Sequence, residues 1–312
     1  MGVSCQILVD PVPNKVHKIG EFVSGVIKYV IDETAEYKDV SLSFIGTGSS
    51  SWSDTDSSYS NTEEYFNTCI KPHTSEPNTD KIILQQGSYE YRYKFQLPEN
   101  IPSTFHNPKG KIIYQIVLNF ETFKRSGIFN LPTIFSTEIP VKAYVKSNLP
   151  KETVVFGLKK TLLGQYGAVN LKAEIEKCLI KPGENIQVKV TVDNHTNVPI
   201  KGIRAAVIER TIYTSTGGFK QTDNPEVSNC AVETDSIPPN DIKIMVCVIP
   251  TTANLYSIQH SKVISRDYFL RVTLKLPIPH HDDFVNMPIV IGDINDTNEA
   301  ISELKKDLEN FV

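Results

Sequence analysis

The chain has 312 residues, with 32 basic and 36 acidic side chains, a formal net charge of −4 at pH 7 and 40% apolar residues. Six acidic and two basic residues lie from Asp293 onward, so the whole net charge belongs to this last segment. The body therefore lacks the basic surface that nucleic-acid binding requires. No window approaches the roughly 18 uninterrupted apolar residues that suggest a membrane-spanning helix.

The cysteines and the N-terminus favour a cytoplasmic protein. The first residues, Met1 to Cys5, lack the basic segment and apolar run of a signal peptide. Five cysteines, an odd number, are widely scattered, which indicates reduced thiols and no disulfide framework. We therefore expect the glycosylation sequons at Asn194 and Asn295 to be accidental.

Strands dominate the first half of the chain. After a short strand at 6–9, Gly20 opens a stretch to Ile45 in which apolar residues alternate with polar or small ones around a polar connection. Such period-two alternation predicts strands with one face on a core, and a glycine before the first suits a turn of positive φ. The polar run 46–60 predicts a hairpin with a mobile tip. Further strands are expected at 82–84, 89–95, 110–118 and 139–145, with the apolar run 110–118 in a central, covered position.

The second half repeats this order. At a constant offset of 163, Gly183 opens the same unit as Gly20, and Val23 corresponds to Ile186, Val40 to Ile203 and Phe44 to Val207. Strands are expected at 169–180, 209–212, 242–249, 263–274 and 288–292, with a loop at 214–229. Residues 147–150, Ser-Asn-Leu-Pro, have the composition of a linker. We therefore predict two similar domains in tandem, 1–147 and 148–294, in an all-β chain.

The last residues, 295–312, form an acidic tail with helical spacing. Asp296 and Glu299 have the spacing of a capping box. The apolar residues Ile301, Leu304, Leu308 and Phe311 fall on one face of such a helix. A helix of about four turns is marginal alone in water. We therefore expect it to be ordered only where that face docks, on the chain's own sandwich or in a partner's groove. The alternative is a disordered tail without a function.

Several motifs resemble the α-arrestins, the arrestin domain-containing proteins. In the first half they are Gly20-Glu21-x-Val23-x-Gly25, Phe44-x-Gly46 with Trp52, Leu84-x-x-Gly87, Leu97-Pro98, Ile101-Pro102-Ser103 and Gly110-x-Ile112-x-Tyr114. In the second half they are Lys181-Pro182-Gly183-Glu184-x-Ile186, Val192-x-Asn194-x-Thr196, Ile249-Pro250, Tyr268-x-Leu270-x-Val272 and Pro288-Ile289-Val290-Ile291-Gly292. The resemblance covers residues 5 to 292 and rests on the order, spacing and duplication of these motifs together.

The resemblance implies two immunoglobulin-like, arrestin-type β-sandwiches joined by a short hinge. It also implies a non-catalytic cytoplasmic adaptor that binds the cytoplasmic parts of membrane proteins and the trafficking or ubiquitination machinery. Such a protein acts in endocytosis and protein transport, is recruited to the plasma membrane or endosomes, and needs no cofactor or metal. The alternative within the same fold is a retromer-type subunit of a sorting coat.

Two features depart from the family pattern. α-Arrestins carry Pro-Pro-x-Tyr motifs that bind ubiquitin ligases, whereas Pro238-Pro239-Asn240-Asp241 is the nearest approach in this sequence. We therefore expect no direct recruitment of ligases through such a motif. Asn14-Lys15-Val16-His17-Lys18 does not form the paired-lysine phosphate sensor of receptor-binding arrestins, so phosphate sensing is not carried over.

A metal-dependent enzyme is the remaining alternative, and His280-His281-Asp282-Asp283 is its one candidate cluster. Because adjacent residues of a strand point to opposite faces, both imidazoles could share a metal only in a loop. We favour a solvated hairpin tip, and we interpret Cys178 and Cys247 as buried small hydrophobes. The aromatic residues Tyr59, Tyr65 and Phe66 either anchor a partner or pack back onto the sandwich, and the second reading is favoured.

Overall fold

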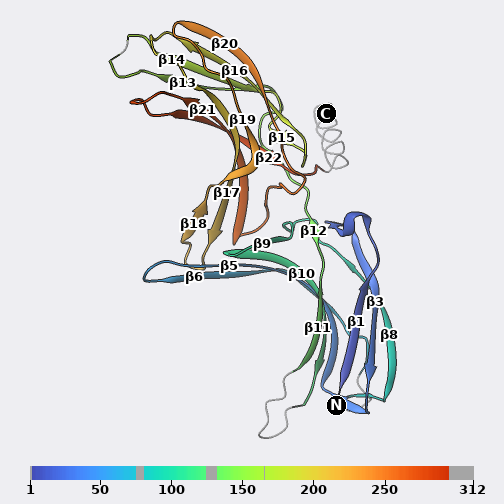
Figure 1. Ribbon diagram of the computed structural model, residues 1–312. Coiled ribbons are helices and arrows are strands. Elements are labelled where there is room, and N and C mark those ends of the chain that lie inside the picture. Colours follow the sequence, from blue (N-terminus) through green and yellow to red (C-terminus); the bar gives the residue numbers. More distant parts are fainter. Residues whose placement is uncertain (1, 75–80, 124–131, 165, 295–312) are drawn as a thin grey trace, which may run out of the picture. The chain divides into compact units, whose positions relative to one another are not determined.

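A computed structural model of the chain describes residues 2–74, 81–123, 132–164 and 166–294. These divide into two compact units (Figure 1). Unit 1 comprises Met1–Ala143 together with the segments Tyr213–Lys220 and His260–Ile264, and unit 2 comprises Tyr144–Ile212, Gln221–Gln259 and the chain from Ser265 onward. Residues 147–150 have no regular secondary structure. The domain limits at 147 and 148 stay predictions, because the units do not follow a single cut in the chain.

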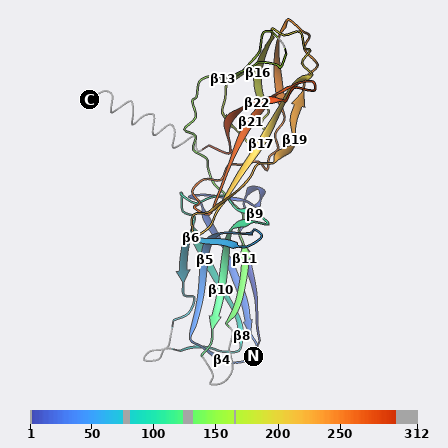
Figure 2. The same ribbon diagram turned by 90° about the vertical axis from the view of Figure 1, so that its left-hand side faces the viewer.

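Unit 1 is a β-sandwich. Its elements are β1 (Val3–Val9), the 3-10 turn η1 (Pro13–Lys15), β2 (His17–Lys18), β3 (Phe22–Ile31), β4 (Ala35–Tyr37), β5 (Asp39–Ser53), β6 (Ser58–Ile70), β7 (Ile82–Leu84), β8 (Gly87–Gln96), β9 (Phe105–Asn107), β10 (Gly110–Glu121), β11 (Thr133–Glu138) and β12 (Val141–Lys142). One sheet has the order β1-β3-β8 and the other the order β11-β10-β5-β6 (Figures 1 and 2). Aromatic side chains join the two layers: Tyr29 meets Phe120, and Phe44 meets Phe95.

Unit 2 is a second sandwich. Its strands are β13 (Val154–Lys160), β14 (Val169–Ile175), β15 (Leu179–Ile180), β16 (Ile186–Asn194), β17 (Gly202–Thr214), β18 (Lys220–Asp223), β19 (Glu226–Glu233), β20 (Asp241–Ile249), β21 (Ile264–Lys275) and β22 (Asp283–Ile291). One sheet has the order β13-β14-β16-β20 and the other β15-β22-β21-β17-β18, with β19 on β17. One cluster of buried apolar side chains fills the space between them. The predicted pair of β-sandwiches is confirmed, whereas the predicted tail helix lies outside the described residues.

The same turn begins the main strand of each unit. Gly20 and Gly183 both have positive φ, +80° and +83°. In each turn a glutamate carboxylate accepts a hydrogen bond from the backbone N–H of a lysine three residues earlier, Lys18 N to Glu21 at 3.0 Å and Lys181 N to Glu184 at 2.9 Å. The residue pairs predicted from the offset of 163 are buried in both copies. The two copies of the repeated sequence unit therefore form the same turn and bury the same positions.

The predicted hairpin at 46–60 is confirmed: β5 runs to Ser53 and β6 returns from Ser58, so the turn occupies only residues 54–57. Gly46 and Gly48 lie where a Cβ would collide with aromatic rings of Tyr114, Phe66 and Tyr65. These small residues therefore make room for neighbouring rings. The predicted loop 214–229, in contrast, contains β18 and the start of β19.

Other expectations need adjustment. β11 and β13 were not predicted, and in β13 the apolar residues Val154, Val155 and Phe156 are consecutive, which conceals the period of two. β10 is central, between β11 and β5. Its alternate residues are buried, Lys111 is exposed and the remaining residues are half-buried. Of the predicted segment 139–145, only Val141–Lys142 is a strand, although Ile139 and Val145 are buried.

We predict that Gly20→Ala and Gly183→Ala each lower the free energy of unfolding by about 1–2 kcal/mol. The left-handed conformation disfavours a Cβ by that amount. The nearest neighbours, Glu99 at 3.6 Å and Ala253 at 3.8 Å from such a Cβ, are at ordinary contact distance and add no clash. Denaturant unfolding measures the effect. Gly20→Asn and Gly183→Asn are the matched controls and should cost less, because asparagine tolerates this conformation. Equal losses for alanine and asparagine would contradict the backbone explanation.

A second prediction concerns His17 and His73, whose stabilising contribution depends on pH. Burial lowers the pKa of both imidazoles, although Glu21 acts in the opposite direction on His17. The unfolded chain therefore binds these protons more readily than the folded chain, so stability is lost as the pH falls through about 6.5. A double variant, His17→Gln and His73→Gln, should unfold with a smaller pH dependence between pH 8 and pH 5. An unchanged slope, after both proteins are referenced to their stability at pH 8, would refute this assignment.

Candidate interaction surface

An exposed apolar row runs along the outer face of β20. Ile242, Ile244 and Val246 are each 61–63% exposed, and Val248 is 44% exposed. β20 is the edge strand of its sheet and pairs only with β16 among the described strands of that sheet. An exposed edge strand with a hydrophobic face is a site where proteins associate, and natural proteins usually protect such edges with charges. We call these four residues the β20 row.

The register of β20 places its more apolar face outside. Residues 242–249 alternate, as predicted, but both sets of alternating positions are largely apolar. Ile249 pairs with Ile186 and Cys247 with Val188, which turns Cys247 and Ile249 into the core. Because successive side chains point to opposite faces, this register forces the β20 row into solvent.

The first copy of the duplicated unit shows that the fold does not require this row. Val23 pairs with Phe95 on β8, as its counterpart Ile186 pairs with Ile249, so β8 and β20 hold equivalent positions. β8 is likewise an edge strand. The exposed residues of β8 that correspond to the β20 row are Ser88, Glu90, Arg92 and Lys94. One copy therefore has a protected polar edge and the other an apolar edge, on the same backbone pattern.

Asn194 positions the beginning of β20. Its fully buried amide nitrogen donates to the carbonyls of Val198 and Pro238, each at 2.9 Å, and its oxygen accepts hydrogen bonds from the N–H and hydroxyl of Thr196. The contact with Pro238 ties the segment that enters β20 to the end of β16. Both amide hydrogens are in use, which agrees with an accidental sequon in the folded chain. The second sequon, at Asn295, lies outside the described residues.

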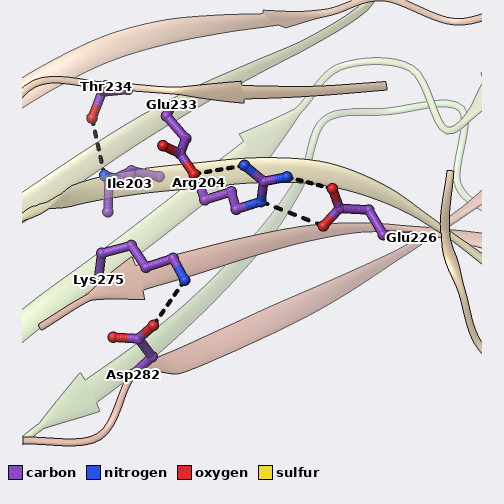
Figure 3. Close-up of polar contacts among 7 residues, drawn as sticks. All are labelled: Ile203, Arg204, Glu226, Glu233, Thr234, Lys275 and Asp282. Atoms are coloured by element: carbon purple, nitrogen blue, oxygen red, sulfur yellow. Dashed lines mark hydrogen bonds and ion pairs between the residues drawn. The ribbon is translucent and has the colours of Figure 1, made fainter. Parts of the chain in front are cut away.

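A shallow polar hollow of about 340 Å³ lies at the start of β17 in unit 2. Figure 3 shows Arg204 between two carboxylates, Glu226 and Glu233. Hydrogen bonds to these carboxylates raise the pKa of the guanidinium. Lys275 approaches Asp282 at 2.9 Å on the other side of the hollow (Figure 3).

Both carboxylates that line this hollow are paired, Glu233 with Arg204 and Asp282 with Lys275. Partial burial acts to raise the pKa of Asp282, but the Leu276 N–H and the Lys275 ammonium outweigh it and hold that pKa below its ordinary value. A ligand would have to displace an existing ion pair to use either group. Such exposed pairs are worth about 0–1 kcal/mol each, so the hollow is a polar contact surface without a single-sign charge for an ionic ligand.

His280, His281 and Asp282 lie in the hairpin loop between β21 and β22, and Asp283 is the first residue of β22. Asp282 binds Lys275 and the Leu276 N–H, and Asp283 lies 3.3 Å from the Lys160 ammonium. In the part of the chain that the structure describes, no group of three or more His, Cys, Asp or Glu side chains is arranged to hold a metal ion. Asp282 and Asp283 thus pair with lysines. Their arrangement in the described residues gives no geometric support for a metal site.

Cys178 and Cys247 are buried, as predicted. Each is 4% exposed, and burial raises the pKa of both thiols. A raised pKa leaves less of the reactive thiolate at neutral pH. Both residues belong to the apolar core of unit 2, which agrees with their reading as small hydrophobes.

The aromatic residues of the first-half hairpin pack within unit 1, as the favoured reading predicted. Tyr59 stacks on Trp52 and also contacts Phe219, while Phe66 stacks on Tyr114. The Tyr65 hydroxyl donates to the Ser261 hydroxyl at 2.9 Å. These rings are engaged by their own unit. The sequence reasoning had considered them as partner anchors and had missed the β20 row, although the apolar residues at both alternating positions of 242–249 were a visible signal.

We predict that Asn194→Ala lowers the free energy of unfolding of unit 2 by about 2 kcal/mol or more. The substitution leaves the buried backbone N–H of Thr196 without its acceptor and removes the hydrogen bonds to the Val198 and Pro238 carbonyls. A buried unsatisfied group costs about 1–3 kcal/mol. Asn197→Ala is the matched control: the Asn197 side chain makes one exposed hydrogen bond, to Asn240, so its loss should cost less than about 0.5 kcal/mol. Equal effects in denaturant unfolding would show that Asn194 does not anchor the entry to β20.

Among the described residues, no helix is long and apolar enough to cross a bilayer. Residues 5–129 match the family described as arrestin (or S-antigen), N-terminal domain. Residues 165–295 match the family described as arrestin (or S-antigen), C-terminal domain. The two matches together cover both halves of the duplicated chain.

Several arrestin domain-containing proteins are similar to the chain. It is 22% identical over 290 residues to arrestin domain-containing protein 1 of Homo sapiens, which covers 92% of this chain and 64% of that protein. It is 26% identical over 247 residues to arrestin domain-containing protein 4 of Homo sapiens, covering 74% of this chain and 54% of that protein. The chain thus spans less than two thirds of the length of either relative.

Proposed function

Because this chain belongs to the arrestin family, with an arrestin N-terminal and an arrestin C-terminal domain, we propose that it is a protein-binding adaptor. In this proposal it engages the cytoplasmic parts of membrane proteins and links them to the trafficking machinery in endocytosis and protein transport. It acts in the cytoplasm and is recruited to the plasma membrane or endosomes. The observation that carries the proposal is the β20 row.

The β20 row supports binding of a protein over binding of a small molecule. Its four residues extend over about 20 Å of strand, at about 3.3 Å for each residue. A flat, elongated apolar strip suits an extended peptide or a helix, whereas a small ligand requires a concave site that surrounds it. Polar and charged residues of β16, such as Lys189 opposite Val246, border the strip. An apolar centre with a polar rim is the usual anatomy of a protein interface.

The two copies of the duplicated unit supply the variant that tests this function. Ile244→Glu with Val246→Arg gives β20 the residues that β8 carries at the equivalent positions, so the fold already tolerates them. Val155→Lys is the matched control, because Val155 is 52% exposed on β13, the opposite edge of the same sheet. Both variants should keep their free energy of unfolding within about 0.5 kcal/mol.

We predict that affinity purification of the full chain from its native cells, followed by mass spectrometry, recovers membrane proteins and trafficking components. The Ile244→Glu, Val246→Arg variant should recover them at least tenfold less, because a buried charge without a partner strongly opposes association. The Val155→Lys variant should recover them as the unmodified chain does. Recovery of the same partners by the double variant would reject the β20 row as the site. Failure of every form to recover such proteins would reject the adaptor function itself.

A further inference from the structure

The side chains of the β20 row can be buried only by an element that packs on the outer face of the sheet. Pairing of β20 with another edge strand, such as β20 of a second copy, would satisfy its free backbone groups. Such pairing extends the sheet sideways and leaves the outward side chains of the row in solvent. Only an element that lies across the face of the sheet covers the row. An amphipathic helix with its apolar face on the strand has the required form.

The chain leaves unit 2 close to one end of the row. The N–H of Gly292 donates to the carbonyl of Ile180, and the N–H of Ser257 donates to the carbonyl of Ile291. Ile180 is followed at once by the Lys181–Glu184 turn, and Ile186, just beyond the turn, pairs with Ile249. One tight turn therefore separates the exit of the chain at Gly292 from the end of β20. The row runs from that end, beginning with Val248.

The acidic tail has the length and pattern to fill the row. The four steps from Gly292 to Asp296, where the proposed helix begins, span up to about 13 Å when extended, more than the roughly 10 Å that separates two stacked sheets. In a helix, the apolar residues from Ile301 to Phe311 extend over about 15 Å, and the row extends over about 20 Å. Leu304 and Leu308 lie between them on the same helical face.

We propose that residues 296–312 bind the β20 row of the same chain as an amphipathic helix. Ile301, Leu304, Leu308 and Phe311 face the row, and the acidic residues of the tail remain in solvent. Docking removes the apolar strip from water and provides the tertiary packing that so short a helix needs. The inference rests on the proposed function in one respect: the tail occupies the surface assigned to partners and so competes with them.

Thiol labelling of the purified full chain tests the docking without any partner protein. In a Cys69→Ser background, which removes the exposed native thiol, Val246→Cys reports access to the row. Its labelling should be at least tenfold slower than that of Val155→Cys on the opposite edge. Adding Leu304→Glu and Leu308→Glu should restore rapid labelling at position 246. Adding Asn298→Glu and Asn310→Glu, which introduces the same charge away from the apolar face, should leave the protection in place.

A disulfide distinguishes the possible occupants. With Val246→Cys and Leu304→Cys in one chain, mild oxidation should give a crosslink within a monomer. Rapid labelling of position 246 in the chain with an intact tail would overturn the proposal. So would protection that persists in the Leu304→Glu, Leu308→Glu variant, and so would crosslinks found only in dimers, which would assign the row to a second copy.

Capture of partners provides a separate readout. If the tail competes for the row, the Leu304→Glu, Leu308→Glu variant should recover several-fold more of the membrane proteins than the unmodified chain. Labelling that supports docking while no form of the chain captures membrane proteins would reject the adaptor function and retain the intramolecular contact. Capture that is abolished by Ile244→Glu with Val246→Arg, but without protection by the tail, would reject the docking and retain the function.

Discussion

The register of β20 against β16 decides what unit 2 presents to its surroundings. A shift of one residue would bury Ile244 and Val246 and expose Cys247, with no change in composition. Two local structures hold the register, one at each end of the ladder. Asn194 ties the entry of β20 to the end of β16, and the Lys181–Glu184 turn sets the start of β16 beside Ile249. The exposure of the β20 row is therefore a consequence of local polar contacts at the two ends of the ladder.

Comparison of the two units distinguishes the features that the fold requires in both from the apolar edge that only unit 2 carries. Both units use a glycine of positive φ and a glutamate that accepts a hydrogen bond from a lysine N–H. The strand that follows this turn, β3 in unit 1 and β16 in unit 2, packs one face on the core. Both also have an edge strand at the equivalent position. In unit 1 that edge carries Glu90, Arg92 and Lys94, and in unit 2 it carries aliphatic residues. Stability alone does not explain four exposed β-branched or aliphatic side chains, whereas a binding surface does.

The sequence was sufficient for the fold class, the duplication and most strands, because one-sided burial imposes a period of two. It failed where that period is absent or ambiguous. Val154, Val155 and Phe156 are consecutive apolar residues, which conceals the strand β13. The orientation of β20 was not predictable either, because both of its faces are apolar and only its hydrogen-bonded partner selects one. The candidate site depended on that selection.

Unit 1 contains two segments from the second half of the chain, and this affects the order in which the protein folds. Gly48 lies against Val263, and Gly110 lies against Tyr213 and Ile264, so two segments of the second half complete the packing of a unit that begins at the N-terminus. During synthesis, the first 143 residues leave the ribosome long before these segments exist. Until residue 264 has emerged, Gly48 and Gly110 lack these neighbours. Unit 1 therefore completes its packing only after these segments of the second half have been synthesised.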